Sequence, residues 1–164
     1  MSKNEDEEEF KYYIDTFKMI PHPEGGHFVQ IFKSNSKVET IEKQSRTACT
    51  FIYFLLHHKE TSYWHQLKSD EIWHFYSGST LIIHTFDEFT KEQKDFYLGN
   101  KTLDKKNEFM VVISAGLWFG ASVFDKNAFS FVGCTVAPGF EYEDFKLAER
   151  NDFELKYPQL NGIL

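Results

Sequence analysis

A histidine and a glutamate six residues apart are the side chains in this chain best placed to do chemistry. His65 lies in the run 63–67 (Tyr-Trp-His-Gln-Leu), and Glu71 opens the run 71–76 (Glu-Ile-Trp-His-Phe-Tyr). Ser69-Asp70 between them is a turn signal, which predicts two strands joined by a hairpin. Because alternate side chains of a strand share a face, both groups can point into one site. An imidazole beside a carboxylate can bind a metal ion or act as an acid/base pair.

Aromatic side chains share the predicted faces of this pair. The residues concerned are Tyr63, Trp73 and Phe75, together with Phe119 from a later strand. Aromatic walls suit sugars and flat rings, and they also fill barrel cores. We predict that these four residues line a ligand pocket, with core packing as the alternative.

Arg46 is a lone cation at the entrance of the apolar run 47–56. A guanidinium in a pocket mouth can hold a carboxylate or phosphate through two parallel hydrogen bonds. At the entrance of a strand it can instead form an ordinary surface ion pair. We predict that Arg46 contacts the ligand, and the surface pair is the alternative.

His74 is the nearest further residue that can ligate a metal. It follows Glu71 by three residues, so in a regular strand its side chain faces the opposite side. A metal set of His65, Glu71 and His74 therefore needs a bulge. We expect no metal or other cofactor, and a divalent ion on that set is the alternative.

A second group of imidazoles surrounds the pair Gly25-Gly26. His22, Glu24 and His27 lie within six residues of one another. Paired glycines are typical of a tight backbone turn, and we interpret this segment as such a turn. Metal binding by the three side chains is the alternative.

Short runs rich in β-forming residues follow one another along most of the chain. A helix precedes them, because apolar residues recur every three or four positions from Phe10 to Ile20. The predicted strands are 27–33, 47–57, 62–67, 71–76, 80–86, 94–98, 108–113, 117–124 and 129–136. We expect a short helix over 142–150 and an extended tail over 151–164. Many short strands at this spacing indicate an all-β sandwich or barrel.

Composition and charge narrow the classes of function. The 164 residues carry a net charge of −7, and residues 1–9 form an acidic tail ahead of one domain over 10–164. A slightly acidic body without a basic cluster disfavours nucleic acid and anionic membranes as partners. No apolar run is long enough to cross a bilayer, and the acidic start does not resemble a signal peptide, so we expect a cytoplasmic protein. Cys49 and Cys134 are then expected as free thiols, with a disulfide left open.

Several blocks of the chain resemble a known family. The spacing His65-x-Leu67-x3-Glu71-x6-Gly78 fits the first cupin motif, His-x-His-x3-or-4-Glu-x6-Gly. Further resemblance lies in 22–28 (His-Pro-Glu-Gly-Gly-His-Phe), 52–56, 64–65, 69–76, 115–118 and 133–140. Together these blocks are similar to the fifth cupin family, a domain of unknown function, over residues 22 to 145.

The resemblance implies a double-stranded β-helix, the cupin jelly-roll barrel, with an N-terminal helix and a short C-terminal helix. It implies a pocket in the barrel mouth and a homodimer. Cupin metal sites typically use three histidines and one glutamate, but here Leu67 and Phe119 occupy two histidine positions. His65 and Glu71 remain, and two ligands rarely hold a divalent ion. The resemblance therefore favours a site without a metal.

We expect the protein to bind a small polar metabolite, with carbohydrates or nucleotide sugars favoured by analogy with epimerase-type cupins. His65 acts as acid or base in this hypothesis, and Glu71 orients it, in a metal-free isomerase-like or epimerase-like reaction. A metal-dependent oxygenase or isomerase is one alternative. A non-catalytic sensor or assembly module is another. The alternating run 27–33 is an edge strand that can pair with a second copy, which also predicts a homodimer.

Overall fold

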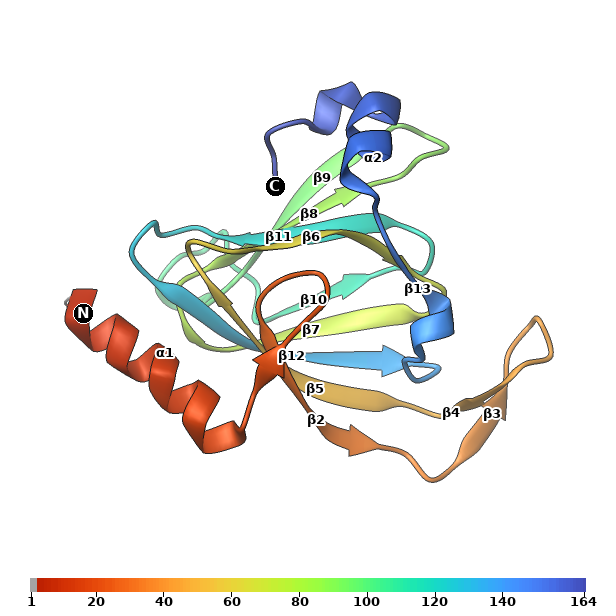
Figure 1. The fold of residues 1–164 in the computed structure, drawn as a ribbon, viewed down its shortest axis with the longest axis horizontal. Coiled ribbons are helices and arrows are strands. Elements are labelled where there is room, and N and C mark those ends of the chain that lie inside the picture. Colours follow the sequence, from red (N-terminus) through yellow and green to blue (C-terminus); the bar gives the residue numbers. More distant parts are fainter. Residues whose placement is uncertain (1–2) are drawn as a thin grey trace.

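Two antiparallel sheets face each other in the computed structural model, which describes residues 3–164 (Figure 1). The first sheet has the order β1 (Ile20–Pro21), β2 (His27–Lys33), β5 (Thr50–His57), β12 (Phe129–Ala137), β7 (Asp70–Gly78) and β10 (Met110–Ile113). The second has the order β13 (Phe145–Leu147), β6 (Thr61–Leu67), β11 (Trp118–Val123), β8 (Leu81–Phe86) and β9 (Gln93–Leu98). This architecture confirms the predicted all-β jelly roll.

A small two-stranded sheet and four helical segments complete the chain. The strands β3 (Lys37–Glu39) and β4 (Ser45–Thr47) form an arm that projects from the barrel (Figure 1). The helical segments are α1 (Lys3–Phe17), η1 (Tyr142–Asp144), α2 (Arg150–Lys156) and η2 (Pro158–Leu160). No helix within residues 3–164 is long and apolar enough to cross a membrane.

The N-terminal helix packs along the first sheet, as its periodicity predicts. Tyr13 stacks on Phe131 with ring centroids 4.2 Å apart, and Phe10 and Phe17 join the same apolar cluster. The helix begins at Lys3, so most of the acidic stretch that we expected as a tail forms its first turns. Acidic side chains in the first turns suit the positive end of a helix dipole.

The C-terminal segment differs from the prediction in position. Residues 142–147 form the single 3-10 turn η1 and the strand β13 in place of the expected longer helix, because Phe145 and Leu147 pair with Leu67 and His65 of β6. The short helix lies over 150–156, in the stretch expected to be extended. Its Phe153 is buried against tryptophans of the second sheet. Tertiary contacts thus decide both local structures.

The strands β6 and β7 do not form the expected hairpin. β6 pairs with β11 and β13 in the second sheet, whereas β7 pairs with β10 and β12 in the first. Ser69-Asp70 is therefore the corner at which the chain crosses between sheets. As a result, side chains of β6 and β7 meet across the barrel interior, where Trp73, Phe54 and Phe119 form part of the core.

Candidate functional site

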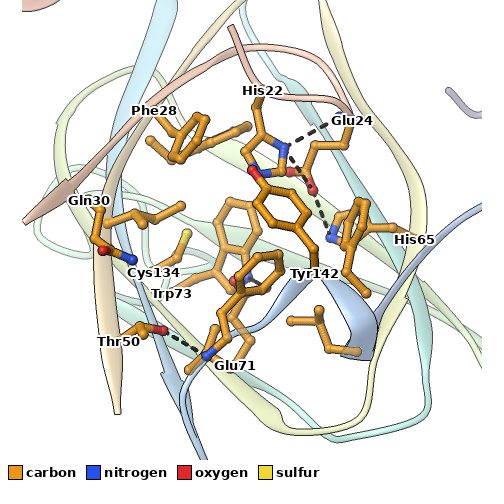
Figure 2. A pocket seen from close by; sticks show the side chains of 16 residues that line it. His22, Glu24, Phe28, Gln30, Thr50, His65, Glu71, Trp73, Cys134 and Tyr142 are labelled. Carbon is orange, nitrogen blue, oxygen red and sulfur yellow. Dashed lines mark hydrogen bonds and ion pairs between the residues drawn. The ribbon is translucent and has the colours of Figure 1, made fainter. Parts of the chain in front are cut away.

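A cavity of about 80 Å³ opens between the two sheets (Figure 2). Its wall combines a few polar groups with many apolar and aromatic ones, the composition typical of small-molecule sites. The sixteen lining residues are His22, Glu24, Phe28, Gln30, Thr50, Ile52, Phe54, His65, Leu67, Glu71, Trp73, Cys134, Val136, Phe140, Tyr142 and Phe145.

Glu24 and His65 form the central polar contact of this cavity. The Oε2 atom of Glu24 lies 3.2 Å from Nε2 of His65, and Oε1 accepts a 2.8 Å hydrogen bond from the Ser62 hydroxyl. Both side chains are almost completely buried, at 7% and 2% exposure. Figure 2 shows the two groups meeting at one side of the cavity. The carboxylate partner of His65 is thus Glu24, from the segment that we had interpreted only as a turn.

The proton positions in this pair follow from the second nitrogen of His65. Its Nδ1 lies 2.7 Å from the Tyr63 carbonyl oxygen, which can only accept, so Nδ1 carries a hydrogen. Burial lowers the pKa of His65 to about 4. Burial also raises the pKa of Glu24, an effect that His22 and Ser62 oppose. A neutral imidazole with its hydrogen on Nδ1 leaves a lone pair on Nε2, and this lone pair faces Oε2 of Glu24 at 3.2 Å.

The turn 22–26 places Glu24 by means of its two glycines. Gly25 has φ +112°, and a Cβ at this position would lie 2.0 Å from the Thr61 carbonyl oxygen, so only glycine fits. The amide of Tyr63 donates a 2.8 Å hydrogen bond to the Glu24 carbonyl and ties the turn to β6. His22 also faces the pair, with Nδ1 3.4 Å from Oε2 of Glu24. Burial lowers the pKa of His22, with Glu24 opposing this effect and His65 adding to it.

Whereas His65 lies on β6 of the second sheet, Glu71 lies on β7 of the first. Its Oε2 accepts a 2.8 Å hydrogen bond from the indole N–H of Trp73. Burial raises the pKa of Glu71 to about 8, and the nearby charge of Glu24 adds to this effect. Within residues 3–164 no hydrogen bond or ion pair joins Glu71 to His65. His65 and Glu71 therefore line one cavity, as strand alternation predicts, but no direct bond joins them; the direct partner of His65 is Glu24.

Two of the predicted aromatic wall residues lie elsewhere. Tyr63 is turned away because β6 has a bulge at the position where the register shifts between Phe119 and Ala121. It packs in a separate cluster, with the Arg150 guanidinium 4.1 Å from its ring. Phe75 packs at the margin of the main core and is absent from the cavity wall described above.

The other two aromatic residues lie at the site. Trp73 lines the cavity, as strand alternation predicts. Phe119 packs against His65 with ring centroids 4.1 Å apart, so it covers the imidazole from the core without reaching the wall of the cavity as described.

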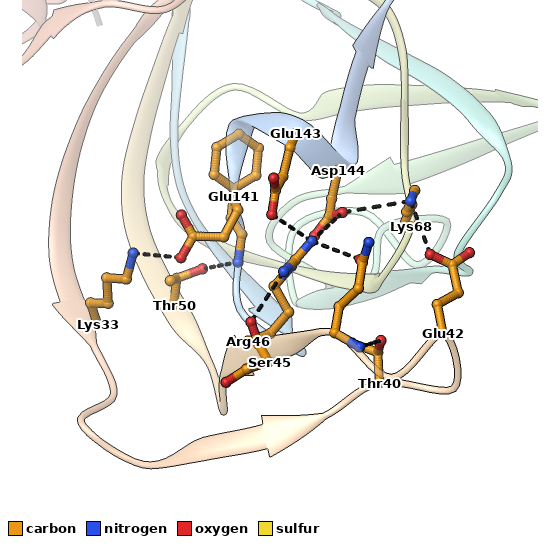
Figure 3. A network of polar contacts seen from close by, with 12 residues as sticks. Lys33, Thr40, Glu42, Ser45, Arg46, Thr50, Lys68, Glu141, Glu143 and Asp144 are labelled. Atoms are coloured by element: carbon orange, nitrogen blue, oxygen red, sulfur yellow. Dashed lines mark hydrogen bonds and ion pairs between the residues drawn. The ribbon is translucent and has the colours of Figure 1, made fainter.

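Arg46 lies outside the cavity wall and holds a carboxylate of the protein itself. Its Nε and Nη2 donate to the two oxygens of Asp144 at 2.6 and 3.0 Å, and Nη2 also lies 2.6 Å from Glu143 (Figure 3). The bidentate geometry that we predicted for a ligand is thus satisfied internally. This contact anchors η1, whose first residue, Tyr142, lines the cavity.

His74 faces away from the cavity, as its position in the strand predicts. Its Nε2 lies 3.2 Å from the Thr135 hydroxyl on the neighbouring strand. The alternative metal set of His65, Glu71 and His74 is therefore not assembled. Among residues 3–164 there is no group of three or more His, Cys, Asp or Glu that could hold a metal ion.

The donor set around His65 does not fit a metal ion either. The Nε2 lone pair that would bind a metal is directed at Glu24, and the neighbouring Leu67 is apolar.

Cys134 lines the cavity as a free thiol, and burial raises its pKa. Cys49 is also free, so the prediction of two unpaired thiols is confirmed.

Sequence reasoning missed Gln30, Thr50, Tyr142 and the phenylalanines around them. Phe28 and Gln30 alternate along β2, a signal that could have placed both on one face. Tyr142 and its neighbours Phe140 and Phe145 depend on how segment 140–145 folds back over the barrel. The spacing of residues along the sequence does not predict that this segment folds back over the barrel.

A family described as Cupin superfamily (DUF985) matches residues 11–148. A search of curated proteins finds no match. A hypothetical protein from Leishmania major superposes with a TM-score of 0.84 at 28% identity, covering 93% of this chain and 94% of its own. A protein from Shewanella oneidensis gives a TM-score of 0.84 at 29% identity, with 93% and 92% covered.

More distant structures share the fold alone. Oxalate decarboxylase from Lactobacillus farciminis, solved as a formate complex, gives a TM-score of 0.58 at 10% identity. The match covers 90% of this chain and 39% of the decarboxylase chain.

Proposed function

The chain belongs to the cupin superfamily, in the family of unknown function DUF985, and on this premise we propose that its cavity binds a small polar metabolite and moves a proton on it without a metal ion. The substrate class that we favour is a carbohydrate. The reaction class is an isomerisation or epimerisation, in which a proton leaves a carbon beside a carbonyl and returns to the same molecule. No oxidant or reductant is needed for such a reaction.

The close approach of Glu24 Oε2 and His65 Nε2 carries this proposal. A buried pair with one proton between Oε2 and Nε2 can deliver that proton to a ligand and take one back. The low exposure of both groups strengthens their coupling, because little water screens them. Glu71 supplies a second carboxyl group on the opposite wall, where a ligand oxygen or nitrogen can meet it.

The cavity wall also supports a carbohydrate. Gln30, Thr50 and Tyr142 offer an amide and two hydroxyl groups for hydrogen bonds to ligand hydroxyls. Aromatic rings such as Trp73 and Phe145 offer flat apolar faces. The small volume limits the buried part of the ligand to one ring or less, so any larger portion remains at the mouth.

Binding is tested by the thermal stabilisation of the protein in millimolar D-glucose, D-mannose and D-glucosamine. We expect at least one sugar to stabilise the wild type and His74→Gln, whereas His65→Gln loses the effect. His74 is the matched control because it lies on β7 but faces outward. Stabilisation that survives His65→Gln, or that no sugar produces, contradicts the proposal.

Two further parts of the proposal concern assembly and location. A homodimer is supported by the edge of β2, because β1 covers only His27 and Phe28 and no other strand of residues 3–164 pairs with β2 on that side. Ile31 and Phe32 add exposed apolar surface there. The cytoplasmic location stays a prediction from the sequence.

A further inference from the structure

Two carboxyl groups are buried in the cavity without a cationic partner. Glu24 and Glu71 are 8% and 6% exposed, and no lysine or arginine of residues 3–164 forms an ion pair with either one. Among the described residues Glu71 accepts a hydrogen bond only from the Trp73 indole, and Glu24 contacts Ser62 and two histidines. Burying a carboxylate is costly unless a proton or a cation compensates it.

The histidines do not provide that compensation. Burial lowers the pKa of both His22 and His65, so both rings are neutral at pH 7. None of the sixteen lining side chains described is a lysine or an arginine. The cavity therefore offers negative charge, or carboxyl groups that must keep their protons, and no positive charge of its own.

The cations near the mouth are already paired with acidic residues of segment 141–144. Arg46 holds Asp144, and Lys33 lies 2.7 Å from Glu141 (Figure 3). Lys68 lies 3.1 Å from Glu42 and 3.8 Å from Asp144. An approaching anion thus meets carboxylates at the rim as well as inside.

The aromatic rings of the wall suit a cation. The same cavity as the two carboxyl groups is lined by the rings of Phe28, Trp73, Phe140, Tyr142 and Phe145. The faces of aromatic rings attract ammonium groups, and desolvation strengthens this attraction. A site that combines carboxyl groups with the faces of aromatic rings binds a positively charged nitrogen more tightly than a hydroxyl group.

We infer that the ligand of this cavity carries a protonated amine, held by Glu71 and Glu24 among the aromatic rings. The inference rests on the proposed function, since it names the ligand class of the same site. With a carbohydrate framework the ligand is an amino sugar or an amino alcohol. We expect phosphorylated, carboxylated and nucleotide-linked sugars, the last of which the resemblance favoured, to bind more weakly because their negative charges would face these carboxyl groups. Amine binding displaces the proton that Glu71 holds in the free protein.

The thiol of Cys134 lines the cavity, so its rate of chemical labelling measures whether the cavity prefers positively charged reagents. Three methanethiosulfonates of similar length are used, bearing an aminoethyl, a hydroxyethyl or a sulfonatoethyl group. Rates of labelling at Cys134 and at the half-buried Cys49 are followed by peptide mass mapping. The Cys49 rates correct for the different intrinsic reactivities of the reagents.

The inference predicts that the corrected aminoethyl rate at Cys134 exceeds the hydroxyethyl rate at least tenfold, and that the sulfonatoethyl rate is lowest. Glu71→Gln should reduce the aminoethyl preference several-fold, while the surface variant Glu92→Gln leaves it unchanged. Equal aminoethyl and hydroxyethyl rates overturn the amine inference but leave the proposed function standing. If the hydroxyethyl reagent leaves Cys134 unlabelled even in incubations long enough to offset the raised pKa of its thiol, the cavity is closed to solutes and both proposals fail.

Calorimetric titration completes the test with D-glucosamine, D-glucose and D-glucuronate. These probes share a ring and differ in charge. We expect the affinity to fall in that order, with glucosamine at least tenfold tighter than glucose. Any other order, or equal responses to all three, overturns the inference.

Discussion

Nε2 of His65 lies 3.2 Å from Oε2 of Glu24, although the two residues are 41 positions apart in the chain. One residue comes from a glycine turn and the other from the middle of β6, and the Tyr63–Glu24 backbone hydrogen bond holds the two segments together. The contact places the unprotonated Nε2 of a buried neutral histidine against a buried carboxyl group, the arrangement that our proposal of proton transfer requires.

The protonation of His65 is the first quantity to measure. We expect its imidazole to stay neutral from pH 7 down to about pH 5, because burial lowers its pKa to about 4. The ¹⁵N chemical shifts of the ring report the charge and also the tautomer, with hydrogen on Nδ1. A titration midpoint near the ordinary value of about 6.5 contradicts the assignment.

Replacing Glu71 by glutamine should change how stability depends on pH. The pKa of Glu71 is about 8 in the folded protein, above its unfolded value, so the folded state binds more protons between the two values. The free energy of unfolding therefore falls as pH rises through this window, by up to about 1.4 kcal/mol per pH unit. In Glu71→Gln this contribution is absent.

The useful window runs from pH 6.5 to 8, above the range in which His65 contributes. His65 has a lowered pKa, so its contribution to stability is complete above pH 6.5 and is lost toward pH 4. Urea unfolding of wild type and Glu71→Gln at pH 6.5, 7.25 and 8 measures the difference in slope. Parallel profiles would show that Glu71 is not a buried acid.

Gly25→Ala should lose at least about 2 kcal/mol of stability, because the new Cβ meets the Thr61 carbonyl oxygen and the backbone is left-handed. Gly116→Ala is the matched control. Gly116 has φ +83° but no atom within 4 Å of the added Cβ, so its cost is about 1 kcal/mol. If the two variants lose the same stability, the turn at Gly25 is not packed tightly against β6.

Much of the barrel was predictable because β-strand alternation and turn residues are local signals. The positions of β2 and β8 follow from them within a residue, and so does the inward direction of His65. The partner of His65 was not predictable, because it depends on where the turn 22–26 docks. The bulge that rotates Tyr63 outward is equally non-local, since it arises opposite Gly120 on another strand.

The crossing of the chain between the two sheets at Ser69-Asp70 was not predictable from local sequence either. A two-residue turn signal between two strands is common to a hairpin and to a corner between sheets. Only the pairing of β6 with β11, and of β7 with β12, separates the two. The prediction of a hairpin between these two strands was wrong for this reason.

Static light scattering at micromolar concentration tests the proposed homodimer. We expect twice the monomer mass of 19.4 kDa. Ile31→Lys should shift the protein toward the monomer, because it places a charge on the unpaired edge of β2. Ile41→Lys, on the exposed loop of the β3–β4 arm, is the control and should leave the mass unchanged. A monomer mass for the wild type would refute the dimer.

The central claim is that Glu24 and His65 move a proton on a bound ligand. Its most direct test is the exchange of carbon-bound hydrogen for deuterium in D-glucosamine, D-glucose and D-fructose dissolved in D₂O, followed by proton NMR. We predict that wild type and His74→Gln speed the loss of a C–H signal next to the carbonyl carbon of at least one sugar. Glu24→Gln should be slower by about a hundredfold or more. Exchange no faster than in buffer, or exchange that Glu24→Gln leaves unchanged, would contradict the claim.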